Sequence, residues 1–177
     1  MEEHQPVADH DEPAVMERTV AVVMCTAVVT IDVEETVLVA WELLERSGSR
    51  HLPVVHPDGR CAGLLDRADV AVACAAPAAS LSGVRVGDLL PVRRPARVQV
   101  EQTVRHAAEL MSCTEADALP VLEEDGRLAG VLTASDIVAA LAGRPVQKQP
   151  ADTRPRATST VLPGLPPRPD YRGTAVP

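Results

Sequence analysis

The stretch TVLVAWELLERSGSRHLPVVHPDGRCAGLLDRADV, residues 36–70, occurs twice in this chain. It aligns without a gap on residues 103–137, TVRHAAELMSCTEADALPVLEEDGRLAGVLTASDI, at an offset of 67 residues. About 15 of the 35 paired positions carry the same residue. Self-similarity at a fixed offset is the signature of an internal repeat, so these two copies decide the fold.

Each copy predicts the element order strand, helix, strand, strand, helix. Apolar residues at i, i+3, i+4 and i+7 indicate an amphipathic helix at the start of each copy. This stripe consists of Val37, Ala40, Trp41 and Leu44 in the first copy and of Val104, Ala107, Ala108 and Met111 in the second. Gly48 suits the end of the first of these helices. Two short β-rich runs follow, separated by an Asp-Gly turn, at 52–55 and 63–65 and again at 119–122 and 130–132. A further strand is predicted before each helix, at 28–31 and 97–100, and a second helix opens near 69 and 136.

A single copy is too small to be stable by itself. A unit of about 55 residues buries only about 60% of its unfolded surface. We therefore expect both copies to pack sheet to sheet in one unit of the α/β (α+β) class, with the first repeat at 14–80 and the second at 81–142. Residues 1–13 and the Pro- and Arg-rich residues 143–177 lack apolar periodicity, so both segments are predicted to be disordered.

The composition excludes several classes of function. The net charge is -8 and Phe is absent, which disfavours nucleic acid as a partner. No stretch has the roughly 20 apolar residues of a membrane span and the N-terminal residues are acidic, so we expect a cytoplasmic protein without a membrane partner. Nucleophile elbow, P-loop and metal-ligand spacings are missing, and we expect no metal, no cofactor and no enzymatic activity. The four cysteines are interpreted as small buried hydrophobes: Cys25, Cys61, Cys74 and Cys113.

The two copies together resemble CBS repeats, the pairs that form a Bateman module. The resemblance rests on a pattern present twice: a helix, Leu-Pro-Val, Asp-Gly-Arg, a Gly before apolar residues, and an Asp before Val or Ile. It covers about residues 19–141. The resemblance implies a β-α-β-β-α unit in each copy, pseudo-twofold packing, frequent homodimerisation, and clefts that in many relatives hold AMP, ATP or S-adenosylmethionine.

In the second copy, Gly130, Thr133 and Asp136 match the nucleotide pattern of that family. An ionised carboxylate only accepts hydrogen bonds, so Asp136 suits the two hydroxyls of a ribose. Thr133 is predicted at a helix start, where its hydroxyl suits a phosphate that also faces the helix N-terminus. Gly130 leaves room for a close backbone approach.

Further ligand contacts follow from the resemblance. It implies that the main chain of the first strand meets the adenine edge and that apolar residues touch the adenine faces; these are Arg97 and Val98, and Leu119 and Pro120. Relatives often place phosphate-binding basic residues before the Leu-Pro pair, which is the position of Arg50 and His51.

The first copy has Asp69 in place of Asp136, but it has Asp66 where the second copy has Thr133. A carboxylate about 4 Å from a phosphate charge costs about 4 kcal/mol at an effective dielectric near 20. We therefore expect the first cleft to bind phosphorylated nucleotides poorly or not at all, although Asp69 could still hold an uncharged nucleoside.

The same residues also have a purely structural interpretation. Thr133 with Asp136, and Asp66 with Asp69, are capping-box patterns, and capping does not exclude ligand binding. Arg50 and His51 are by default solvated loop residues. Two functions therefore stay open. One is a regulatory module that binds an adenine nucleotide or S-adenosylmethionine and signals to an unidentified partner protein, and the other is a structural dimerisation module with no bound nucleotide.

Overall fold

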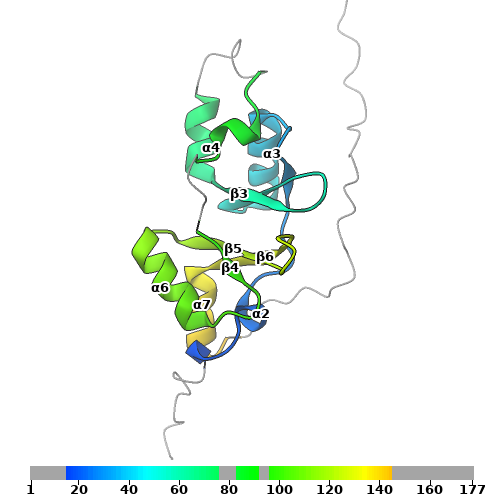
Figure 1. Cartoon of the computed structure of the whole chain (residues 1–177). Coiled ribbons are helices and arrows are strands. Elements are labelled where there is room, and N and C mark those ends of the chain that lie inside the picture. The colour runs from blue at the N-terminus through cyan, green and yellow to red at the C-terminus, as the bar shows by residue number, and fades with distance from the viewer. Residues whose placement is uncertain (1–14, 76–82, 92–95, 145–177) are drawn as a thin grey trace, which may run out of the picture.

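The computed structural model describes residues 15–75, 83–91 and 96–144, which form two halves of the same design (Figure 1). In each half a three-stranded sheet lies toward the other half, and the helices lie on the outer side. The first half contains β1 (Ile31–Asp32), α3 (Val37–Ser47), β2 (His51–Val55), β3 (Cys61–Asp66) and α4 (Arg67–Cys74). The second half contains β4 (Val98–Gln99), α6 (Val104–Thr114), β5 (Ala118–Leu122), β6 (Leu128–Thr133) and α7 (Ala134–Leu141). The predicted α+β fold with two β-α-β-β-α units is confirmed.

Both sheets have the same pairing. β1 runs parallel to β2, and β2 runs antiparallel to β3, and the three strands of the second half repeat this arrangement. The first strand of each sheet is shorter than predicted. The strand predicted at 28–31 overlaps β1 only at Ile31, because only Ile31 and Asp32 find partners on β2. The strand predicted at 97–100 shrinks to two residues for the same reason.

The first helix of each unit begins at a threonine and ends at a left-handed residue. Thr36 and Thr103 each accept, through Oγ1, the amide N–H three residues further on, at 3.4 and 3.2 Å. α3 ends at Gly48 with φ 65°, as the sequence predicts, whereas α6 ends at Glu115 with φ 55°. The buried faces follow the predicted stripes and consist of Val37, Ala40 and Leu44 in α3 and of Val104, Ala107 and Met111 in α6.

The segment before each repeat packs on the other half. α2 (Val20–Val23) joins the hydrophobic core of the second half, and the 3-10 helix η1 (Val86–Leu89) contributes Val86 to the core of the first. The two attachments are equivalent. The N–H of Val20 donates to the carbonyl of Gln102 and that of Val86 to the carbonyl of Glu35, both at 2.8 Å. Each core is therefore completed by a segment that precedes the other repeat.

Contacts between the hairpins show the pseudo-twofold symmetry directly. Cys61 donates its N–H to the carbonyl of Gly126 at 3.1 Å, and the equivalent bond with the halves exchanged measures 3.3 Å. Arg60 and Arg127, which are equivalent in the repeat, form an antiparallel bridge between these two bonds. The copies therefore pack through their sheets and hairpins, as expected.

Two expectations concern regions at the edge of this fold. The segment 1–13 lies outside the described residues, as does 143–177 apart from Gly143 and Arg144. Within the described part of the chain, no helix has the length and apolar character needed to cross a bilayer.

The prediction of buried cysteines is wrong for Cys113, which is exposed because it lies off the apolar stripe of α6, while the other three are half-buried.

Candidate functional site

The predicted nucleotide motif lies where β6 ends and α7 begins. Thr133 is the last residue of β6 and the N-cap of α7, and its Oγ1 accepts the N–H of Asp136 at 3.1 Å. Asp136 returns the contact through Oδ2, which accepts the Thr133 N–H at 2.8 Å and the Thr133 hydroxyl at 2.6 Å. The motif therefore forms a complete capping box, and the structural interpretation of these residues is confirmed.

The capping box leaves part of the Asp136 carboxylate available. Both side chains are half-buried, and the contacts with Thr133 use Oδ2 alone. Oδ1 accepts no hydrogen bond from the side chains and backbone that the structure describes. A carboxylate oxygen held in place beside a helix N-terminus suits a ribose hydroxyl. The Thr133 hydroxyl is committed to Asp136, so it would have to rotate to donate to a phosphate.

Gly130 has no room for a side chain, because another segment of the same chain packs against it. A Cβ at this position would lie 2.5 Å from the carbonyl oxygen of Cys25, closer than atoms in van der Waals contact. Cys25 exchanges both backbone hydrogen bonds with Val131, at 2.9 and 3.0 Å. The close backbone approach predicted at Gly130 is therefore made by the segment that follows α2.

The predicted adenine contacts lie on opposite faces of the sheet of the second half. Leu119 is fully buried in the core on the helical side, together with Val98. Pro120 is also buried, but because side chains alternate along a strand it lies on the opposite face, toward the first half. Leu119 therefore points away from the junction, whereas Pro120 lines it.

Arg97 is exposed and precedes β4. Burial raises the pKa of the Cys61 thiol on β3, and the positive charge of Arg97 opposes this shift. Arg97 therefore lies close enough to Cys61 of the first half for its charge to act on that thiol.

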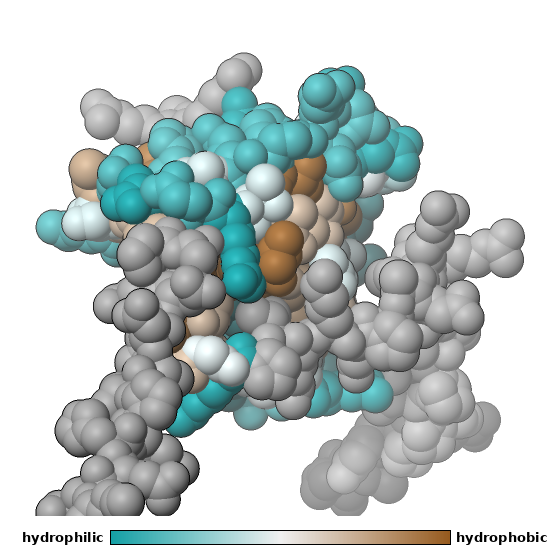
Figure 2. Space-filling model, turned by 90° about the horizontal axis from the view of Figure 1, so that it is seen from below, coloured by the Kyte–Doolittle hydropathy of each residue, from teal (hydrophilic) through white to brown (hydrophobic). Residues whose placement is uncertain are grey.

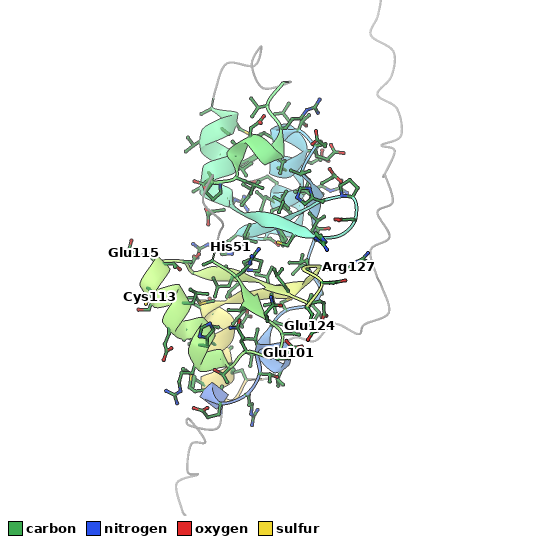
Figure 3. All side chains as sticks on the ribbon, in the orientation of Figure 1. His51, Glu101, Cys113, Glu115, Glu124 and Arg127 are labelled. Atoms are coloured by element: carbon green, nitrogen blue, oxygen red, sulfur yellow. The ribbon has the colours of Figure 1, made fainter. Side chains whose placement is uncertain are left out.

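Arg50 and His51 are engaged by the other half. Arg50 Nη2 lies 3.2 Å from Asp117 Oδ2, and His51 Nε2 lies 2.9 Å from Asp117 Oδ1. Figure 3 shows His51 at the junction between the halves. Sequence reasoning missed Asp117. The repeat alignment contained the signal, because Asp117 is the equivalent of Arg50 and opposite charges at equivalent positions meet at a pseudo-twofold axis.

The first half does not form the same motif. Asp66 caps α4 by accepting the N–H of Ala68 at 2.6 Å through Oδ1. Asp69 is exposed, and the described contacts include no reciprocal bond between it and Asp66. The expected capping box is therefore wrong here. Its physical reason is that Asp66 Oδ1 accepts the N–H of Ala68 instead of that of Asp69, and two acidic side chains side by side repel each other.

Two hollows on the described surface lie elsewhere. One of about 310 Å³ and another of about 450 Å³ flank the outer side of α7, where Val138 is 64% exposed. Figure 2 shows apolar side chains gathered at this helical end of the molecule. Neither hollow is lined by Thr133, Asp136 or Arg97, so neither is the predicted nucleotide site.

The fold and the junction together define a paired-repeat module of the α+β class. The chain belongs to the CBS domain family, whose model matches residues 20–76 and 86–143. The first match runs from α2 through α4 and the second from η1 through α7.

Similar proteins agree with this assignment. A CBS domain-containing protein of Dictyostelium discoideum is 31% identical over 123 residues, which cover 65% of this chain and 85% of that protein. The crystal structure of CBSX2 in complex with AMP is 27% identical with a TM-score of 0.63, and the match covers 71% of this chain and 97% of that one. A homoserine O-acetyltransferase of Methanosarcina acetivorans is 27% identical over 115 residues, and the match covers 65% of this chain but only 20% of the enzyme.

Proposed function

We propose that this chain is a non-enzymatic regulatory module that binds an adenine nucleotide at the junction between its halves and signals its presence to a partner protein. The observation that carries the proposal is the Asp136 carboxylate, which is fixed by Thr133 through one oxygen while the other is free to accept. The similarity to a CBS protein crystallised with AMP supports the choice of ligand.

The proposed contacts follow from the geometry of the second half. Asp136 Oδ1 accepts a ribose hydroxyl, and the N-terminus of α7 favours the negative charge of the phosphate. Pro120 and the backbone of Val98 border the adenine, and Arg97 lies on the side of the first half. A phosphate that reaches Arg50 or His51 has to compete with Asp117 for them.

Signalling follows from the shared construction of the halves. A ligand at the junction contacts one half and borders the other, so it stabilises one relative arrangement of the two. α2 precedes the first repeat but packs in the core of the second half, and η1 precedes the second repeat but packs in the core of the first. A change in the relative arrangement of the halves is therefore passed on to the outer helices. We place the module in the cytoplasm, with no role for a resident cofactor.

A structural dimerisation module without nucleotide is the second candidate. Its support is apolar surface on the outer helices, where Val72 of α4 is 75% exposed and Leu38 of α3 is 48% exposed. Exposed apolar side chains on packed helices favour association. We propose a homodimer in either case, and sedimentation at tens of micromolar should show twice the chain mass for the wild type and one chain mass for Val72→Asp.

The decisive experiment is calorimetry with AMP on the full chain in the presence of EDTA. We expect about one site per chain, lost in Asp136→Ala and retained in Asp69→Ala, the matched change in the first half. ATP and S-adenosylmethionine are titrated in parallel to define the ligand. If none of the three binds to the wild type, the structural module is the correct function; if Asp69→Ala alone removes binding, the site lies in the first half.

A further inference from the structure

Three metal-ligating side chains from both halves meet at the junction. His51 opens β2 and is the register partner of Asp66, the last residue of β3, while Asp117 precedes β5 of the other half. His51 Nε2 lies 2.9 Å from Asp117 Oδ1 and 3.5 Å from Asp66 Oδ2. The three donor atoms all lie within 4.8 Å of one another.

These spacings suit one small cation. Zn²⁺ binds imidazole nitrogen and carboxylate oxygen at about 2.0–2.2 Å, so two donors at tetrahedral angles are about 3.4 Å apart. The 2.9 and 3.5 Å distances from His51 bracket that value, and all three donor atoms lie within 4.8 Å of one another, so they can close around one ion by moving toward a common centre.

The two carboxylates are already oriented by contacts outside the triad. Asp66 Oδ1 is held by the N–H of Ala68 at 2.6 Å, and Asp117 Oδ2 by Arg50 at 3.2 Å. In each case the other oxygen faces the imidazole of His51. Such outer contacts fix the direction of a ligand before the ion arrives. The His51 side chain is 11% exposed, whereas those of Asp66 and Asp117 are 36% and 51% exposed, so the imidazole is the most buried of the three donors.

We propose that His51, Asp66 and Asp117 form a binding site for one divalent ion of the Zn²⁺ class, open at a fourth position to water. An imidazole with two carboxylates selects a borderline first-row ion over Mg²⁺ or Ca²⁺, which prefer oxygen ligands alone. The ion joins the halves, since Asp117 belongs to the second. The same Asp66 that disfavours a phosphate in the first cleft supplies one of the donors.

The repeat itself provides an internal comparison. The positions of His51 and Asp66 in the second half are Ala118 and Thr133, which are register partners in the same way. Neither offers an imidazole or a carboxylate, so the site exists on one side of the pseudo-twofold axis and we expect one ion per chain.

The test uses the full chain, stripped with EDTA and dialysed free of it, without nucleotide. Titration with ZnCl₂ is followed by calorimetry and by the imidazole ¹⁵N resonances of the histidines. We expect the His51 resonance to shift, and the Zn²⁺ affinity of that site to fall by at least about tenfold in Asp117→Asn and to disappear in His51→Ala. His106→Ala, which removes an exposed histidine of α6, is the matched control and should bind like the wild type. MgCl₂ at the same concentrations should leave the His51 resonance unchanged.

A Zn²⁺ titration in which the His51 resonance does not move, or in which His51→Ala and His106→Ala bind equally, would overturn the proposal. Folding is checked for each variant by its melting temperature, and Asp117→Asn retains the shape of the native side chain. Asp136→Ala separates this site from the proposed function, because it should lose AMP and keep Zn²⁺. If the wild type binds Zn²⁺ but does not bind AMP, the nucleotide proposal alone is rejected.

Discussion

A single difference between the repeats, Asp66 in place of Thr133, separates the two clefts chemically. The Thr133 hydroxyl donates a hydrogen bond to Asp136, and the pair forms a closed capping box. Asp66 cannot donate, so its second oxygen turns toward His51 and Asp69 is left without the reciprocal bond. The fold accepts both residues because each caps a helix. A bound phosphate would distinguish them, because only a carboxylate repels it.

Asp66→Thr should create a second AMP site. The change removes a carboxylate whose repulsion of a phosphate is about 4 kcal/mol at 4 Å and an effective dielectric near 20, less in solvent and salt. Thr also supplies the hydroxyl that can close a box with Asp69. Calorimetry should show about two sites per chain instead of one. Asp66→Glu keeps the charge and should stay at one site; two sites in both variants would show that charge is not the reason.

Cys61 should be the slow thiol of the chain and Cys113 a fast one. Burial raises the pKa of Cys61, opposed by a backbone hydrogen bond of Gly63 and by the charge of Arg97, whereas Cys113 is exposed on α6. The thiolate is the reactive form, so alkylation of Cys61 near pH 8 should lag behind that of Cys113 and accelerate only above pH 9.0, the ordinary pKa of a thiol.

Mass spectrometry of peptides after timed alkylation measures both rates. The linked effect on stability has a definite sign. A folded pKa above the unfolded one means that the contribution of the thiol is fully present below the unfolded pKa and is lost as the pH rises through the folded pKa. Alkylation of Cys61 as fast as that of Cys113 at pH 8 would contradict this account.

At the scale of elements, the strongest predictions from sequence were those with a repeated local pattern. The stripes of α3 and α6 and the left-handed Gly48 depend on neighbours within one or two turns, and each occurs as expected. The attachment of α2 to the other half was not predictable, because four apolar residues in a row carry no periodicity that indicates a partner. Asp117 was missed for a related reason, since its contact depends on the packing of both halves.

Gly130→Ala should destabilise the protein more than its equivalent, Gly63→Ala. A Cβ at Gly130 meets the backbone carbonyl of Cys25 at 2.5 Å, while a Cβ at Gly63 meets the end of the Leu90 side chain at 2.7 Å. A side chain can rotate away and a paired backbone cannot. We expect a loss of about 1–3 kcal/mol at Gly130 and less at Gly63, measured by urea unfolding. Equal losses would mean that the Cys25 segment yields easily.

At the scale of the whole molecule, the described residues end just after α7. Among the described residues, the buried members of both cores lie between Val20 and Ile137, and residues 143–177 carry no apolar periodicity. A chain truncated after Arg144 should therefore melt within a few degrees of the full chain. Calorimetric melting of the two chains checks this, and a drop of many degrees would show that the C-terminal segment packs on the core.

The exchange of α2 and η1 between the halves affects how cooperatively the protein unfolds and how the module can be duplicated or transferred. A fragment that contains only residues 15–75 would carry α2 without the core it fills and would lack Val86 for its own. Neither repeat is thus an autonomous folding unit, and the pair should unfold in one transition. Duplication or transplantation of this module into another protein must therefore carry the whole pair, because a break between the repeats divides both cores at once.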